Sequence, residues 1–208
     1  MGGTMTAEPV PTAGDSPAAE SRWPVPPRQG YTVDDLFNLP DLPPHTELID
    51  GSLVFVSPQR KFHSLAMYLL ESGMRATVPE TLRVRREMAV VLSPGTVPEP
   101  DICVVRAEAD KDGRQTRYEA EDVVLAVEVV SPDSQERDRD TKPHKYARAG
   151  IPHFWRVEMS GDEDRPVVYV YELDPTTMVY AVTGIHHDQL KLSVPFQVDI
   201  DLTGIDHL

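Results

Sequence analysis

The sequence predicts an α/β (α+β) protein in which helices flank a mixed β-sheet, with a C-terminal β-hairpin extension. Two observations lead to this class. Residues 62–76 carry apolar side chains at helical spacing, which indicates a core-facing helix. Residues 123–130 form a short run that is apolar on both faces, as expected of a central strand covered on both sides. Because further strands neighbour each other along the chain, a mixed sheet follows.

The length of 208 residues predicts a single folded domain after a leader. Residues 1–30 are rich in Pro, Ala, Gly and Ser and are expected to be a disordered leader, which leaves 31–208 as the domain. No apolar stretch is long enough to span a membrane, and no signal peptide is visible. The single Cys103 fits a reducing compartment. We therefore expect a cytoplasmic protein with no membrane partner.

The N-terminal elements follow from local signals. Thr32 can cap a short helix over 33–39. Residues 47–56 read as a β-hairpin, because Asp50-Gly51 is a preferred two-residue turn. The helix over 62–76 comes next.

The remaining elements are mostly strands. Residues 82–92 predict one or two strands, followed by strands over 101–105 and 123–130 that a charged, Gly-containing linker joins. A helix should end at Gly150, since Gly is the usual residue just past a last helical turn. Three strands complete the chain, and a turn at Asp174-Pro175 joins the last two into the hairpin extension; they cover 154–157, 167–173 and 178–182.

The formal net charge of -14 argues against a nonspecific nucleic-acid coat, whose affinity depends on Lys and Arg. It does not exclude a nuclease, because a metal ion offsets the charge of site carboxylates locally. The cations gather in two regions, at 60–86 and at 137–148. Each group reads either as a solvated face or as part of a groove that follows phosphates.

Two acids stand where a metal site is expected. Asp101 opens one apolar strand, and Glu128 lies inside another, where a charge rarely occurs without a partner. Mg²⁺ takes a few hard oxygen ligands, commonly one or two carboxylates plus waters and substrate phosphate. Asp101 and Glu128 could therefore hold one ion between neighbouring strands. The alternative for Glu128 is a structural pair with a buried Arg.

The other candidate residues would serve this pair. A nearby Lys would orient or deprotonate an attacking water and offset charge on the phosphate, and Lys142 and Lys145 follow Glu128 in the chain. Glu47 could complete the ligand set or form a salt bridge within its hairpin. His63 is an accessory candidate, and its plainer interpretation is a residue at a helix start. Either lysine could equally be a solvated side chain.

Taken in order, these pieces resemble the PD-(D/E)XK phosphodiesterase superfamily, and within it the Uma-type restriction endonucleases, a bacterial group defined as a domain of unknown function. The resemblance covers residues 31–160. It is carried by E-L-I-D-G at 47–51, Ser57-Pro58 with His63, P-E-P-D-I at 98–102, V-E-V-V-S-P-D-S at 127–134, K-x-x-x-Y-x-x-A-G-I at 142–151 and His153-Phe154-Trp155.

The resemblance implies a restriction-endonuclease-like core and a Mg²⁺ ion, replaceable by Mn²⁺, held by Asp101 and Glu128. It also implies DNA as substrate and a possible homodimer. The superfamily's third residue lies two positions past the glutamate, where this chain has Val130. The group's pattern supplies Lys142 from the following helix instead. Pro143 disfavours helical geometry at Lys142, so the helix either starts there or runs through Pro143, and Lys145 is kept as the substitute.

Three functions are consistent with the residues. The first is a Mg²⁺-dependent endonuclease that hydrolyses DNA by a metal-activated water, with Asp101, Glu128 and Lys142 as its catalytic residues. The second is a non-catalytic module on the same fold that binds nucleic acid or protein. The excess of acidic residues and the displaced lysine support this function. The third is a metal-dependent hydrolase of another phosphodiester, because a fold does not fix a substrate.

Overall fold

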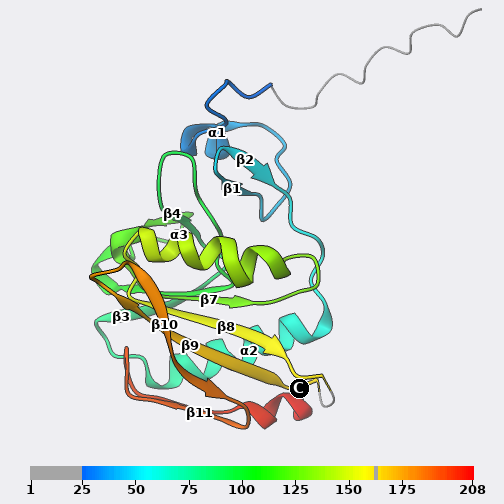
Figure 1. Cartoon of the computed structure of the whole chain (residues 1–208), viewed down its shortest axis with the longest axis vertical. Coiled ribbons are helices and arrows are strands. Elements are labelled where there is room, and N and C mark those ends of the chain that lie inside the picture. The colour runs from blue at the N-terminus through cyan, green and yellow to red at the C-terminus, as the bar shows by residue number, and fades with distance from the viewer. Residues whose placement is uncertain (1–24, 162–163) are drawn as a thin grey trace, which may run out of the picture.

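A six-stranded mixed sheet forms the centre of the computed structural model, which describes residues 25–161 and 164–208 (Figure 1). Its strand order is β10-β9-β8-β7-β5-β3. The pair β7–β8 is parallel and every other pair in this sheet is antiparallel. The strands are β3 (Leu82–Arg86), β5 (Ile102–Arg106), β7 (Val123–Val129), β8 (His153–Met159), β9 (Pro166–Asp174) and β10 (Val179–His186). The predicted fold class is confirmed, and the β9–β10 hairpin extends one edge of this sheet.

Helices cover the two faces of the sheet. The 17-residue helix α2 (Lys61–Thr77) packs its apolar stripe on one face, where Met67, Leu70 and Met74 meet Val127 and Trp155. The short helix α3 (Lys142–Arg148) lies on the other face, and Figure 1 shows it above β7. Since both faces are covered, β7 is buried along nearly its whole length, as its apolar pattern predicted.

The N-terminal elements form a small subassembly with a core of its own. It consists of α1 (Val33–Asn38) and the hairpin β1 (Glu47–Ile49) and β2 (Ser52–Val54). Thr32 caps α1 through the amide of Asp35, as expected. The hairpin turn needs positive φ twice, and Asp50 and Gly51 supply φ of 49° and 74°. This turn fixes the pairing of β1 with β2, in which Glu47 lies opposite Val54.

The predicted leader lies mostly outside the described residues. The described part of it ends in a turn, in which the amide of Gly30 donates a hydrogen bond of 2.8 Å to the carbonyl of Pro27. Gly30 then packs directly on Gly51, leaving no room for a Cβ on either. The described order therefore reaches back before Tyr31.

Two regions differ from the sequence-based expectation. The linker over 106–122 contains β6 (Arg117–Glu119), which pairs in parallel with β4 (Ala89–Val91), between short helical turns at Ala107–Ala109 and Ala120–Asp122. A second hairpin, β11 (Gln189–Leu192) and β12 (Val198–Asp201), packs on α2 and leads into a final turn at Leu202–His207. Both escaped prediction because their strands are three or four residues long and gain stability from tertiary packing rather than from local pattern.

The sequence left open whether the helix before Gly150 starts at Pro143 or runs through it, and the structure combines the two: α3 begins at Lys142, with Pro143 in its first turn, but a helical turn precedes it. A π-helical turn over Arg137–Thr141 runs directly into α3, with the amide of Lys142 donating to the carbonyl of Arg137. Pro143 has no amide hydrogen to donate, and the widened turn before it accommodates its ring. Lys142 therefore stands inside a continuous helical segment instead of at its start. The helix does end as predicted, at Gly150 with φ of 82°.

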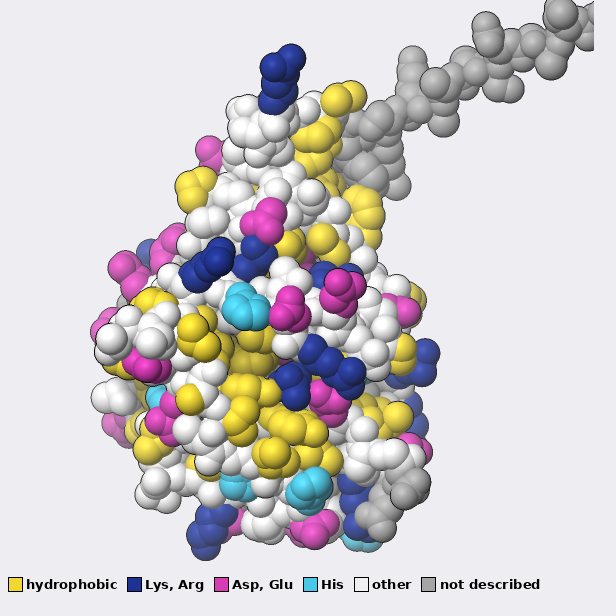
Figure 2. Space-filling model, in the orientation of Figure 1, with side chains coloured by type: hydrophobic (Ala, Val, Ile, Leu, Met, Phe, Trp, Pro, Cys, Tyr) yellow, Lys and Arg dark blue, Asp and Glu magenta, His cyan; other side chains and the backbone are white. Residues whose placement is uncertain are grey.

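The surface on the α3 side mixes charges of both signs. Figure 2 shows acidic and basic side chains interspersed on this face, with an apolar patch beneath the level of α3. The exposed aliphatic residues of the edge strand β10 are Val179, Val182 and Ile185. No helix in the described part of the chain is long and apolar enough to cross a membrane.

Candidate metal and phosphodiester site

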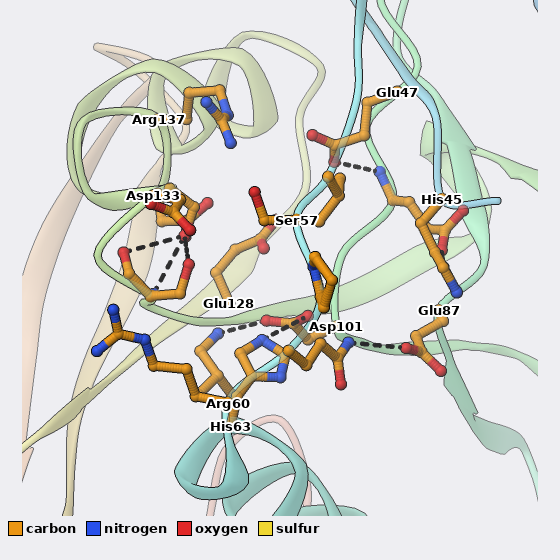
Figure 3. Close-up of a pocket in the computed structure, with 18 of the residues that line it drawn as sticks. His45, Glu47, Ser57, Arg60, His63, Glu87, Asp101, Glu128, Asp133 and Arg137 are labelled. Carbon is orange, nitrogen blue, oxygen red and sulfur yellow. Dashed lines mark hydrogen bonds and ion pairs between the residues drawn. The ribbon is translucent and has the colours of Figure 1, made fainter. Parts of the chain in front are cut away.

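A pocket of about 440 Å³ opens between the β1–β2 hairpin, the start of α2 and the helical segment that precedes α3 (Figure 3). Its lining is strongly charged. The acidic residues are Glu47, Glu87, Glu99, Asp101, Glu128, Asp133 and Asp138, and the basic ones are His45, Arg60, His63, Arg137 and Lys142. Five of the six candidate residues from the sequence therefore meet in one cavity.

Glu128 lies on the floor of this pocket. Side chains alternate along β7, so that Ala126 and Glu128 point to the α3 side while Val127 and Val129 point to α2. One oxygen of Glu128 accepts a hydrogen bond of 3.1 Å from Lys142 Nζ, and the other accepts one of 2.6 Å from the Tyr146 hydroxyl. The partner of this buried acid is thus a lysine, whereas the structural alternative had required an arginine.

Lys142 is buried among carboxylates. Besides Glu128, its ammonium lies 2.8 Å from Glu47 Oε1 and 3.5 Å from Asp138 Oδ1. The same oxygen of Glu47 accepts the amide hydrogen of Glu99 at 2.8 Å. Glu47 therefore joins the cluster around Lys142, and the alternative of a salt bridge within its own hairpin does not occur.

Burial dominates the protonation of this cluster. It raises the pKa of Glu128 well above the usual range, and the Lys142 charge offsets only part of that rise. It raises the pKa values of Asp138 and Tyr146 as well. Burial acts to lower the pKa of Lys142, but Glu128, Glu47 and Asp138 outweigh it, so that the net shift is upward. The Lys142 ammonium consequently stays charged at neutral pH.

Asp101 lies beside Glu128. Ile102 on β5 pairs with Val127 on β7, so the antiparallel register sets Asp101 opposite Glu128. Asp101 Oδ2 accepts the amide hydrogen of Val129 at 2.6 Å. Its other oxygen lies 3.1 Å from Nε2 of His63, a buried residue whose Nδ1 has no partner in the described part of the chain. The two predicted metal ligands are thus held side by side, Glu128 on β7 and Asp101 directly before the neighbouring strand β5.

Lys145 stands apart from this cluster. Its ammonium lies 2.6 Å from the carboxylate of Asp50 in the hairpin turn, and it does not line the pocket. Lys145 therefore links α3 to the hairpin that carries Glu47. Of the two lysines, only Lys142 contacts Glu128 in the structure.

Several pocket residues were not predicted from the sequence. Asp138 stands four positions before Lys142, the spacing that brings two side chains together on one helix, but its burial was not foreseeable. Glu99 is part of the P-E-P-D run, and it forms a 2.5 Å contact with His45. Desolvation raises the pKa of Glu99, and the hydrogen bond from His45 opposes that rise.

The donor set suits a divalent cation coordinated partly by water. Asp101 and Glu128 each accept two hydrogen bonds or close contacts, and a carboxylate offers about four lone-pair positions. Both therefore retain capacity for a hard cation. Across the described residues, no three His, Cys, Asp or Glu side chains form a metal cage. The two carboxylates would suit a hard cation that binds through one or two carboxylates and keeps several waters, as Mg²⁺ does.

Comparison with known proteins agrees with this architecture. Residues 33–203 match the sequence family Uma2, described as "putative restriction endonuclease". Among solved structures, a crystal structure from Anabaena variabilis, described as a putative nuclease belonging to DUF820, superposes with a TM-score of 0.63 at 17% identity. The match covers 84% of this chain and 96% of that one, and at this identity it establishes the shared fold alone. No curated protein sequence matches the chain.

Proposed function

The chain belongs to the Uma2 family of putative restriction endonucleases, and from this premise we propose that it is a Mg²⁺-dependent endonuclease that hydrolyses phosphodiester bonds of DNA. One observation carries the proposal. Asp101, directly before β5, and Glu128 on the neighbouring strand β7 line a single pocket, with the Lys142 ammonium 3.1 Å from Glu128. Two carboxylate ligands for a metal and a nearby cationic side chain are parts that metal-dependent hydrolysis of a phosphodiester uses.

Asp101 and Glu128 would hold the metal ion. When bound, the ion supplies positive charge at the scissile phosphate and lowers the pKa of a coordinated water. The protein keeps both carboxylates in place beforehand, because the Val129 amide and His63 orient Asp101 while Tyr146 and Lys142 orient Glu128. Such support for ligand side chains commonly decides metal affinity.

Lys142 would act as a charged hydrogen-bond donor. Since its pKa is raised, it carries a proton at neutral pH and cannot abstract one from water. Its ammonium instead orients the attacking water and offsets negative charge that develops on the phosphate. Glu47 and Asp138 hold the ammonium against Glu128 and are positioning residues in this scheme.

A specific observation favours a second candidate, a non-catalytic binding module on the same fold. Lys142 already neutralises part of the charge of Glu128, so the buried cluster is partly balanced without a metal. Under this candidate, the carboxylates would be structural and Mg²⁺ would bind no more tightly than to other acidic surfaces.

The deciding experiment combines metal binding with cleavage. Calorimetry should show one Mg²⁺ or Mn²⁺ site in the wild type that Asp101→Asn removes. The control Asp140→Asn should retain it, because Asp140 is an exposed acid outside the pocket. A panel of single-stranded, duplex and supercoiled DNA should then be cleaved only with the metal. Absent cleavage together with equal metal affinity in both variants would favour the non-catalytic module; metal binding without DNA cleavage would favour a different phosphodiester.

A further inference from the structure

Two arginines in the pocket have no acidic partner among the described residues. Arg60 is the N-cap residue of α2, and Arg137 opens the π-helical turn before α3; Figure 3 shows both among the lining side chains. Neither forms a salt bridge there, although the chain carries 34 acidic residues against 20 basic ones. Other arginines do find acids, in the pairs Arg85–Asp110, Arg139–Glu158 and Arg165–Asp206.

Arg137 shows the contrast most clearly. Its Nε is buried and has no hydrogen-bond partner in the described structure, a costly state for a charged donor. Arg139, two residues further on, turns outward and binds Glu158. The Arg137 guanidinium is thus left available to a group that enters the pocket.

The start of α2 adds donors beside Arg60. No side chain caps this end of the helix, and its first turn contains no acid. The first amide to bond within the helix is that of Ser64, which donates to the carbonyl of Arg60, so the amides of residues 61–63 have no intrahelical acceptor. Free amides and the helix dipole both favour an anion here.

We propose that Arg60, the first turn of α2 and Arg137 form a phosphate-binding subsite for a nucleic-acid strand, next to the Asp101–Glu128 pair. The inference rests on the proposed function and names the group of the substrate that these residues hold. A guanidinium matches phosphate oxygens through paired hydrogen bonds. The two arginines belong to different walls of the pocket, so one strand could contact both.

The subsite also explains how a negatively charged strand could enter an acidic pocket. Seven acids line the pocket, and they would repel a polyanion if no cations compensated their charge. A metal at Asp101 and Glu128 would compensate only locally. The two unpaired guanidiniums provide the remaining attraction and fix the strand relative to the carboxylates. They therefore govern binding, whereas Lys142 and its carboxylates govern chemistry.

The test measures binding without cleavage. A short fluorescent DNA strand is titrated with protein in EDTA and followed by anisotropy over a range of salt concentrations. Arg60→Gln and Arg137→Gln should each weaken binding about ten-fold, the effect of losing one charge-assisted contact. Each should also reduce the slope of log Kd against log salt by about 0.7. The matched control is Arg148→Gln, which removes an equal charge from an exposed site outside the pocket and should behave like the wild type.

Strands with and without a terminal phosphate identify the phosphate that is bound. Equal losses for both strands assign the subsite to an internal phosphodiester, and a loss confined to the phosphorylated strand assigns it to a chain end. Either result supports the subsite. It is overturned if the wild type does not bind, or if both pocket variants bind with the affinity and salt slope of Arg148→Gln.

Two further measurements keep the outcomes separate. Because neither arginine has an ion pair, both Gln variants should have the melting temperature of the wild type. If either variant melts at a lower temperature, the corresponding Arg→Lys variant, which keeps the charge, should restore most of the affinity for DNA. Failure of the Lys variant to do so counts against the subsite. Cleavage is assayed separately with Mg²⁺. If the protein cleaves DNA but the variants bind it as the wild type does, the subsite is refuted and the proposed nuclease function stands. If the variants bind DNA more weakly but no protein cleaves it, the subsite stands and the nuclease function is refuted.

Discussion

Replacing Lys142 by Met should destabilise the protein strongly and in a pH-dependent way. The substitution keeps most of the aliphatic stem and removes the ammonium from among Glu128, Glu47 and Asp138. At the observed separations of 2.8, 3.1 and 3.5 Å and an effective dielectric constant of about 20, each attraction amounts to roughly 5 kcal/mol. Desolvation cancels several kcal/mol per ion, so the expected net loss is about 3–5 kcal/mol at neutral pH.

The pH dependence follows from the carboxyl groups. Burial already raises the pKa values of Glu128 and Asp138 above those of the unfolded chain, and loss of the ammonium raises them further. A group with a raised folded pKa contributes its stability below the unfolded pKa and loses it as pH rises through the folded pKa. The variant should therefore approach the wild type near pH ~4, where these acids are protonated in both the folded and the unfolded chain, and fall further behind as pH rises through their folded pKa values.

Urea denaturation at several pH values measures the difference. The control is Lys145→Met, three residues away on the same helix, whose partner Asp50 is 72% exposed and whose loss should cost less than about 1 kcal/mol. Adding Glu128→Gln to Lys142→Met should recover part of the loss, because it removes one of the stranded charges. A deficit for Lys142→Met below about 1 kcal/mol, constant between acidic and alkaline pH, would refute the buried cluster.

Four further expectations concern the site and its supports. Lys142→Ala should lower the cleavage rate at saturating Mg²⁺ by about two orders of magnitude, with metal affinity little changed, and Lys145→Ala should cost much less; the reverse ranking in single-turnover kinetics would move the role to Lys145. Glu128→Gln should abolish Mg²⁺ binding in calorimetry while circular dichroism stays native, and retained affinity would place the metal elsewhere. Gly51→Ala should destabilise the protein more than Gly150→Ala in thermal melts. Both glycines have positive φ, which should cost about 1–2 kcal/mol at Gly150, but only at Gly51 would the new Cβ meet backbone, 2.9 Å from the Gly30 Cα. Equal losses of stability would contradict the packing of Gly30 on Gly51. The hydrogen bond to Glu99 raises the pKa of His45 above 6.5. The contribution of His45 to stability should therefore be complete below pH 6.5 and disappear as pH rises through the folded pKa. His45→Gln should remove this pH dependence, and a pKa of His45 at or below 6.5 in an NMR titration would contradict the prediction.

Local signals predicted those parts of the fold that local geometry determines. The Asp50-Gly51 turn, the α2 stripe and the doubly apolar β7 each carry their reason within a few neighbouring residues, and all three occur as expected. The short strands β6, β11 and β12 depend on partners distant in sequence, so their existence was hidden.

The candidate site divides in the same way. Asp101 was identifiable because it opens an apolar run and Glu128 because it interrupts one, and the register of two strands then places them together. The sequence did not decide whether Lys142 or Lys145 serves the site, since Pro143 left open where the helix starts, and the π-helical turn before Lys142 had no local signal. The importance of Arg60 and Arg137 lies in what they fail to contact, which no sequence reveals.

The π-helical turn at Arg137–Thr141 accommodates one residue more than an α-helical turn requires. In a regular α-helix, one inserted residue would rotate every later side chain by about 100°. The wider turn absorbs that rotation, so deleting one residue from it should restore regular winding and leave Lys142 directed towards Glu128. The number of residues between the acid and its lysine is therefore less constrained than the position at which the two side chains meet.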